Sequence, residues 1–142
     1  METTITENNK ATARKFMQFV SEHNLEELCK MITPTWTMYG GLPNLPKGQE
    51  GMHKLFEHLR LVKQVWTIND IVAESDKVVV RATNTCMQDE SFGIPVKGKQ
   101  QVFTAMFMHK FVDGKIDETF RNADDLGRVF QLGGQVVQGS SS

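Results

Sequence analysis

Residues 113–133 read DGKIDETFRNADDLGRVFQLG, and within this short stretch the chain combines a turn, a strand, a polar cluster and a helix. Asp113 and Gly114 lie between two runs of alternating apolar residues. An Asp-Gly pair adopts the positive φ angles of a two-residue hairpin turn with little strain. The stretch therefore predicts a β-hairpin, followed by a short helix that starts at Asp124 or Asp125.

The second strand of this hairpin has one face that changes from apolar to polar along its length. Alternate residues of a strand project to the same side, so one face holds Ile116, Glu118, Phe120, Asn122 and Asp124. A face that begins apolar and ends with an amide and a carboxylate predicts the floor of a pocket. A single β-bulge would invert this assignment.

Upstream of this hairpin, helices come first and strands afterwards. Apolar spacing predicts helices over residues 9–23, 24–32 and 49–63, and strands over residues 35–39, 65–72, 77–87, 101–112 and 115–123. Residues 1–8 are expected to be frayed. The segment 40–48, rich in Gly and Pro, is expected either to cover the mouth of a pocket or to be a plain connector, and residues 89–99 form a long hairpin loop.

This order predicts an α+β fold, in which a curled antiparallel or mixed sheet wraps around the N-terminal helices as a cone and encloses a cavity. At 142 residues the chain has room for one domain, expected over residues 1–133. Residues 134–142 are expected to be a disordered tail.

Composition excludes several classes of partner. Sixteen Lys and Arg against 17 Asp and Glu leave a net charge of -1, without the basic excess of a nucleic-acid surface. The chain has neither a signal-peptide pattern nor an apolar run of the ~20 residues that a membrane span needs, so we expect a cytoplasmic protein. Cys29 and Cys86 have no paired spacing and are expected to be reduced thiols. No residues have metal-ligand spacing, and we expect no metal.

Asp124 is the strongest candidate for a catalytic residue. A carboxylate at the end of an apolar strand face would have its pKa raised toward the range that is useful for proton transfer at neutral pH. The competing interpretation is that Asp124 or Asp125 only caps the following helix. Asn122, on the same predicted face, could donate a hydrogen bond to a substrate oxygen.

His109 is the second candidate. Its predicted face on strand 101–112 also carries Phe103, Phe107 and Phe111. Such a histidine is either a hydrogen-bonded core residue or, beside the acidic end of the last strand, half of a His–carboxylate pair for acid/base chemistry. Tyr39 either supplies a phenol to the pocket or is a packing residue.

The segment 98–133, GKQQVFTAMFMHKFVDGKIDETFRNADDLGRVFQLG, resembles the SnoaL-like polyketide cyclases of the nuclear transport factor 2-like superfamily. The matching positions are His109, residues 112–116, Asp124, Leu126-Gly127 and residues 131–133, and the likeness extends over residues 9–133. The resemblance implies a cofactor-free enzyme that acts on a polycyclic or polyketide-like substrate with an aspartate as general acid/base. It assigns that role to Asp124 with His109 beside it, or to Asp125 if the register slips by one.

The sequence thus predicts a cyclase or isomerase for a hydrophobic carbonyl compound, forming a homodimer through the exposed face of its sheet. Asp124 and His109 are the predicted catalytic residues, and the predicted substrate-binding residues are Tyr39, Trp36, Phe107, Phe120 and Asn122. No cofactor, metal, nucleic acid or membrane is expected to take part. Two alternatives remain open: a non-catalytic carrier or sensor of a small apolar ligand, and an interaction module whose cavity is filled by side chains.

Overall fold

The computed structural model describes residues 2–87, 90–91, 93–95 and 99–139. Its elements are α1 (Glu2–Glu22), α2 (Leu25–Lys30), β1 (Ile32–Tyr39), α3 (Gly48–Leu59), β2 (Lys63–Glu74), β3 (Lys77–Met87), β4 (Glu90–Ser91), β5 (Ile94–Pro95), β6 (Gln101–Val112), β7 (Lys115–Ala123) and α4 (Asp125–Gln131). The α+β order is confirmed, and the predicted bounds of β3, β6 and β7 agree with the structure.

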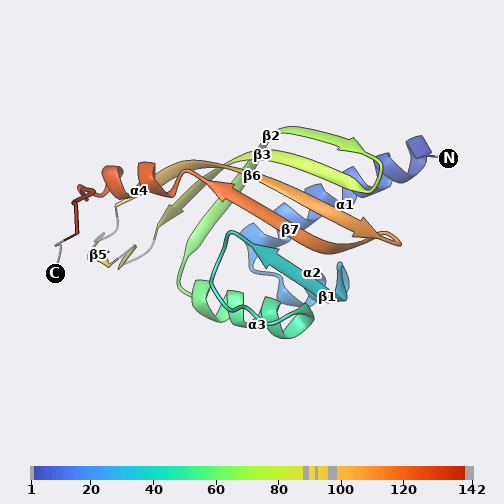
Figure 1. The fold of residues 1–142 in the computed structure, drawn as a ribbon, viewed down its shortest axis with the longest axis horizontal. Helices are drawn as coiled ribbons and strands as arrows, with labels where there is room; N and C mark the ends of the chain where they lie inside the picture. Colours follow the sequence, from blue (N-terminus) through green and yellow to red (C-terminus); the bar gives the residue numbers. More distant parts are fainter. Residues whose placement is uncertain (1, 88–89, 92, 96–98, 140–142) are drawn as a thin grey trace.

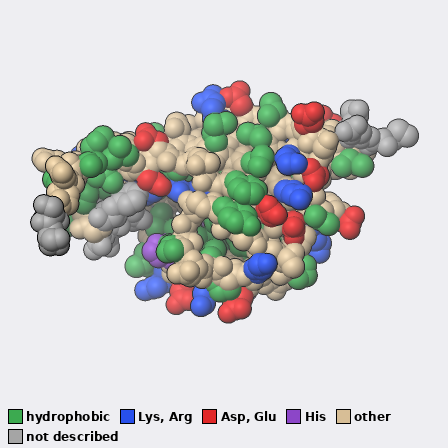
Figure 2. Space-filling view, in the orientation of Figure 1, with side chains coloured by type: hydrophobic (Ala, Val, Ile, Leu, Met, Phe, Trp, Pro, Cys, Tyr) green, Lys and Arg blue, Asp and Glu red, His purple; other side chains and the backbone are tan. Residues whose placement is uncertain are grey.

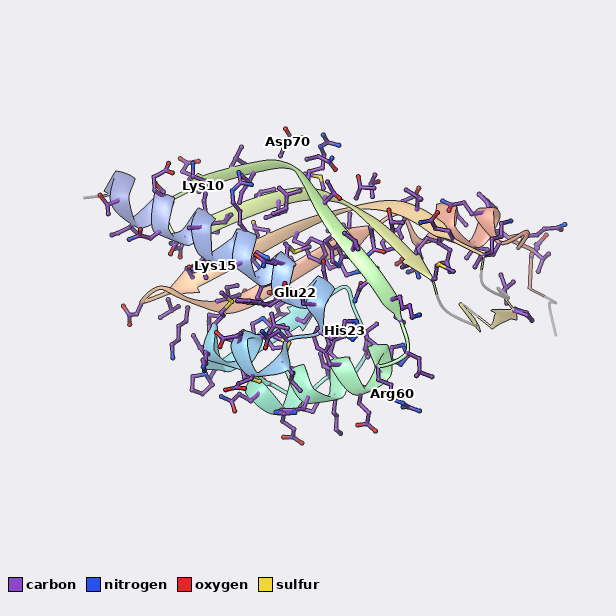
Figure 3. The ribbon with its side chains drawn as sticks, turned by 180° about the vertical axis from the view of Figure 1, so that it is seen from behind. Lys10, Lys15, Glu22, His23, Arg60 and Asp70 are labelled. Atoms are coloured by element: carbon purple, nitrogen blue, oxygen red, sulfur yellow. The ribbon has the colours of Figure 1, made fainter. Side chains whose placement is uncertain are left out.

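A five-stranded sheet in the order β1-β7-β6-β3-β2 forms the body of the protein. The β1–β7 pair is parallel and the other three pairs are antiparallel, so the sheet is mixed. The strands curl around α1, and α2 and α3 lie along one side of the sheet (Figure 1). Seen from behind, the labelled Lys10, Lys15 and Glu22 follow α1 in front of the sheet (Figure 3). The predicted wrapped sheet is confirmed.

The N-terminal helices follow from apolar spacing and capping. Ala13, Phe16 and Met17 are buried on one side of α1, as their helical spacing predicts. The helix begins at Glu2, so the prediction that residues 1–8 fray is wrong for the described part. At α2, the Asn24 side chain accepts a hydrogen bond from the Glu27 backbone N–H at 3.3 Å, which caps the start of the helix.

A hairpin and a bulge set the orientation of β7. Asp113 and Gly114 have φ angles of 49° and 82°, which confirms the predicted two-residue turn. Phe111 pairs with Ile116, whereas Lys110 pairs with Glu118, so Asp117 is an extra residue in β7. The Asp117 carboxylate accepts hydrogen bonds from the hydroxyls of Thr33 and Thr35 on β1, each at 2.6 Å, and these bonds hold the bulge.

Beyond the bulge the faces of β7 are the reverse of those predicted. Thr119 is buried, and Thr119 and Arg121 line the interior, whereas Asn122 is exposed. The prediction that Phe120, Asn122 and Asp124 share the inner face is therefore wrong, because the extra residue shifts the alternation by one.

Residues 88–89, 92, 96–98 and 140–142, which include parts of the predicted loop and tail, lie outside the described residues. Residues 134–139 form no helix or strand, and the disorder of the tail stays a prediction. Within the described residues, no helix combines the length and the apolar character that crossing a membrane requires.

Candidate active-site cavity

A cavity of about 280 Å³ lies between the inner face of the sheet and helices α1, α3 and α4. Most of its wall is apolar and is supplied by Phe16, Met17, Trp36, Met52, Phe56, Trp66, Phe103 and Phe107. The Trp66 ring meets Phe103 and Phe107 edge-on, with centroids 5.7 and 5.1 Å apart. Gly41 and Leu42 also line the cavity, so the first part of the 40–48 loop belongs to its wall.

Arg121, Asp125 and Arg128 form a charged cluster on this apolar wall. The Arg121 guanidinium donates to both Asp125 carboxylate oxygens at 3.1 Å, and Arg128 Nη1 lies 3.4 Å from Asp125 Oδ1. The arginine side chains are only 16% and 13% exposed. Arg121 lies four and seven residues before the other two charges, and this helical spacing is the sequence signal that could have revealed the cluster.

The cluster keeps Asp125 ionised. Burial acts to raise the pKa of Asp125, but the hydrogen bonds and positive charges of Arg121 and Arg128 outweigh it and lower the pKa below its usual value. Two guanidinium groups and one carboxylate leave one net positive charge beside the cavity. The site therefore combines an ionised carboxylate with an excess of positive charge.

Asp124 lies on the other side of the start of α4. Its side chain is exposed and accepts a hydrogen bond from the Gly127 backbone N–H at 2.9 Å, which is the geometry of a helix N-cap. Asp124 does not line the cavity, whereas its neighbour Asp125 does. The catalytic role of Asp124 stays a prediction, and the geometry favours Asp125 as the carboxylate that a bound ligand would meet.

The position of α4, and hence of Asp125, depends on contacts with β6. The Gln131 side-chain amide accepts from Val102 N–H at 2.9 Å and donates to the Val102 carbonyl, much as a neighbouring strand would. The backbone N–H of Asp124 donates to the Thr104 carbonyl at 3.0 Å. Lys99 donates to the Gln131 carbonyl at 2.7 Å. These bonds extend the sheet pairing beyond the end of β7 and hold α4 at both its start and its end.

His109 is fully buried behind the cavity wall. Its Nδ1 lies 2.9 Å from Thr119 Oγ1, which also accepts a hydrogen bond from Trp36 Nε1 at 3.0 Å. Burial lowers the pKa of His109 to about 4, so the ring is neutral at pH 7. Trp36 and Thr119 line the cavity, whereas His109 does not.

The structure keeps the two predicted catalytic residues apart. Asp124 is bonded to Thr104, which is five residues from His109 along β6, or roughly 17 Å at about 3.4 Å per residue. The predicted His–carboxylate pair is therefore not formed. His109 instead orients Thr119 and, through it, Trp36.

Thr119→Val is expected to lower the free energy of unfolding by about 3 kcal/mol. The variant would leave two buried groups, Trp36 Nε1 and His109 Nδ1, without their shared partner, at roughly 1–3 kcal/mol each. Urea denaturation measures the loss. Thr119→Ser keeps the hydroxyl and serves as the control, and an equal loss in both variants would contradict the role assigned to the hydrogen bonds.

The predicted binding residues divide into two groups. Trp36 and Phe107 line the cavity, as predicted. Tyr39 is 46% exposed and stacks on Phe120 with ring centroids 4.7 Å apart, on the face of the sheet that carries the exposed Asn122. The prediction that these three residues point into the pocket is wrong, because β1 turns Trp36 inward and the β7 bulge turns Phe120 and Asn122 outward.

Candidate metal ligands do not gather in the described part of the chain. Across residues 2–87, 90–91, 93–95 and 99–139, no three His, Cys, Asp or Glu side chains are placed to share an ion. Cys29 and Cys86 are both free thiols, of which Cys86 is buried and lines the cavity.

Comparison with known proteins gives a family and several similar structures. The sequence matches the SnoaL-like domain over residues 13–119. AclR from Streptomyces galilaeus, provisionally named a hydroxylase, is 22% identical over 90% of this chain and 97% of its own, with a TM-score of 0.74. A protein from Acidithiobacillus ferrooxidans, provisionally named a polyketide cyclase, is 24% identical over 89% of this chain and 94% of its own, with a TM-score of 0.77.

A second protein provisionally named a polyketide cyclase, from Xanthomonas campestris, has a TM-score of 0.78 at only 10% identity, over 90% of this chain and 98% of its own. At these identities the structural likeness establishes the fold alone. No curated protein sequence matches the chain.

Proposed function

The chain belongs to the SnoaL-like domain family, and on that premise we propose that it is a cofactor-free cyclase or isomerase that uses general acid/base catalysis on a hydrophobic carbonyl compound. One observation carries the proposal: the ionised Asp125 carboxylate lies with two arginines on the wall of a mostly apolar cavity. Family membership supports the reaction class, and the charged cluster supports the mechanism.

In the proposed reaction, Asp125 takes a proton from the carbon next to a substrate carbonyl. The electron pair of that C–H bond moves to the carbonyl oxygen and forms an enolate. The enolate is then protonated at another carbon in an isomerisation, or attacks a second carbonyl of the same molecule in a cyclisation. Asp125 returns its proton to the product, so no oxidant or reductant is needed.

Arg121 and Arg128 would stabilise the negative charge throughout this transfer. As Asp125 becomes neutral, the charge moves to the enolate oxygen, and both positions lie beside the same two guanidinium groups. Donors aimed at a forming oxyanion in a site that excludes water are worth roughly 3 kcal/mol each. The arginines therefore offset the weak basicity of a carboxylate whose pKa they lower.

Solvent deuterium exchange tests this proposal without knowledge of the natural substrate. The protein is incubated in D₂O with a panel of bicyclic and tricyclic ketones, and mass spectrometry follows deuterium incorporation next to the carbonyl. We expect catalysed exchange for at least one ketone that binds. Val20→Trp, which fills the cavity wall away from the charged cluster, should abolish that exchange, and exchange that persists in this variant would place the chemistry elsewhere.

The second candidate is a non-catalytic carrier of a small apolar ligand. It is favoured by the exposed, helix-capping Asp124 and by the neutral, shielded His109. A carrier would bind panel members without any deuterium incorporation. The interaction module with a filled interior has less support, because the cavity is open.

We also propose a homodimer, formed through the outer face of the sheet. Val72, Val79, Met108, Phe120 and Tyr39 are register neighbours across the five strands and form an apolar row on that face. Figure 2 shows hydrophobic side chains grouped over the strands in the middle of this face. An apolar sheet face of this kind can bury itself against a second copy.

Val72→Glu with Met106→Glu is expected to weaken this dimer at least about tenfold, because the dimer would have to bury four unpaired carboxylates. Both residues are exposed, at 62% and 50%. Light scattering over a concentration series measures the change. Leu61→Glu, an equally drastic change outside the sheet, is the control. A monomeric wild type would contradict the proposal.

A further inference from the structure

Two amide side chains in the cavity wall use only half of their hydrogen-bonding capacity. Gln64 of β2 and Asn84 of β3 both line the cavity, and Asn84 Nδ2 donates to Gln64 Oε1 at 3.0 Å. Asn84 is 1% exposed. Among the described residues, Gln64 Nε2 and Asn84 Oδ1 have no hydrogen-bond partner, although both atoms are buried.

The pair offers one donor and one acceptor whichever way the amides are turned. If both amides rotate by half a turn, Gln64 donates to Asn84, and the spare groups become Gln64 Oε1 and Asn84 Nδ2. If only one amide rotated, two N–H groups or two carbonyl oxygens would face each other, and the hydrogen bond between Gln64 and Asn84 would be lost. One spare donor and one spare acceptor, on two side chains bonded to each other, are therefore a fixed property of this wall.

The side chains around the pair are aromatic. Trp66 and Phe103 are the register neighbours of Asn84 on β2 and β6, and their rings meet edge-on. A ring system lying against these aromatic side chains would present its edge to the amides. A site that offers hydrogen bonds to a ligand discriminates strongly against an analogue without the matching groups, because its own buried polar groups then stay unpaired.

We propose that Gln64 and Asn84 form a subsite for the edge of a flat ring compound that carries an acceptor and a donor on adjacent atoms, as the C=O and N–H of a lactam do. The subsite would thereby select the substrate of the cavity. This inference rests on the proposed function in so far as the cavity is the substrate site. The proposed subsite adds a second recognition element to the cavity. It lies on β2 and β3, whereas the charged cluster lies on β7 and α4.

Three ring compounds of similar size test the subsite by calorimetric titration. 2-Quinolinone has both groups on adjacent atoms, coumarin has the acceptor with a ring oxygen in place of N–H, and naphthalene has neither. We expect the wild type to bind 2-quinolinone at least about tenfold more tightly than coumarin, and coumarin more tightly than naphthalene. Equal affinities for 2-quinolinone and coumarin would overturn the inference.

Two variants locate the preference. In the double variant Gln64→Leu with Asn84→Leu, no polar partner is left behind, and we expect 2-quinolinone and coumarin to bind equally. Gln64→Glu keeps the acceptor for Asn84 Nδ2 but removes the spare donor, so both carbonyl compounds should bind at least about tenfold more weakly. Asn122→Leu, on the outer face, is the control.

A wild-type preference that survives in both subsite variants would overturn the assignment. These titrations measure binding alone and are independent of turnover. A lactam preference without deuterium exchange would support the subsite and contradict the proposed reaction. Exchange without the preference would support the reaction and contradict the subsite.

Discussion

Asp125→Asn is expected to lower the rate of deuterium exchange at least about 100-fold, because general acid/base groups contribute typically 10²–10⁴ in rate. The substitution keeps the size of the side chain but removes its basicity. Asp125 is also the shared partner of Arg121 and Arg128, so an amide there leaves two mostly buried guanidinium groups without a counter-charge. Activity is therefore measured per folded molecule, with circular dichroism as the check on folding.

Asp124→Asn is the matched control for this experiment. Asparagine caps a helix about as well as aspartate, so α4 should stay in place and exchange should stay close to the wild-type rate. The opposite pattern, with exchange lost in Asp124→Asn and kept in Asp125→Asn, would support the assignment made from sequence resemblance. It would contradict the mechanism proposed from the geometry.

Protein stability is expected to fall by about 3 kcal/mol between pH 6.5 and pH 4 on account of His109, at ~1.4 kcal/mol for each unit of pKa shift. Burial lowers the pKa of His109 to about 4 in the folded state, from 6.5 when the side chain is in water. In this range the unfolded chain binds a proton that the folded protein does not, so acid favours unfolding. Above about pH 7.5, where the unfolded chain is also deprotonated at this residue, the contribution of His109 is constant.

The difference between wild type and His109→Gln isolates this contribution. Glutamine does not titrate, so the free energy of unfolding of the variant should lack the His109 slope, and the two curves should diverge only below about pH 7.5. Urea denaturation at several pH values gives both curves. Parallel curves down to pH 4 would mean that the folded protein binds the His109 proton as readily as the unfolded chain does. That result would contradict the burial of a neutral His109.

Much of the fold could be predicted because local patterns determine it. The Asp113-Gly114 turn fixed the register of the last hairpin, and alternation of apolar residues gave the bounds of β3, β6 and β7. Helix periodicity located α1 and α3. Each of these signals depends on residues close together in the chain.

The arrangement of the site could be predicted only in part, because one residue reversed a face. Asp117 bulges out of β7 and accepts hydrogen bonds from Thr33 and Thr35, which are more than 80 residues away in sequence. No local sequence pattern predicts that contact. The reversal brings Arg121 into the cavity and removes Asn122 from it. Phe107 was placed correctly because the pairing of β6 with β3 is regular along its length, and Trp36 lines the cavity as predicted although the pairing of β1 with β7 shifts between Ile32 and Thr37.

The polar wall at Gln64 and Asn84 was missed for a different reason. The inner face of β3 carries Val78, Val80 and Ala82 before Asn84, so the change from apolar to polar was visible in the sequence. The role of Asn84 could not be predicted from this change, because its hydrogen bond to Gln64 joins two strands and depends on their register.

We propose that Asp125 meets a carbonyl compound inside the cavity, and a crystal structure with a bound panel ketone checks this claim. The ketone should lie against Trp66 and Phe107, with the carbon next to its carbonyl about 3–3.5 Å from an Asp125 carboxylate oxygen, as proton transfer requires. Its carbonyl oxygen should face Arg121 or Arg128. A ketone that lies outside the cavity, or whose reacting carbon is nearer to Asp124, would contradict the claim.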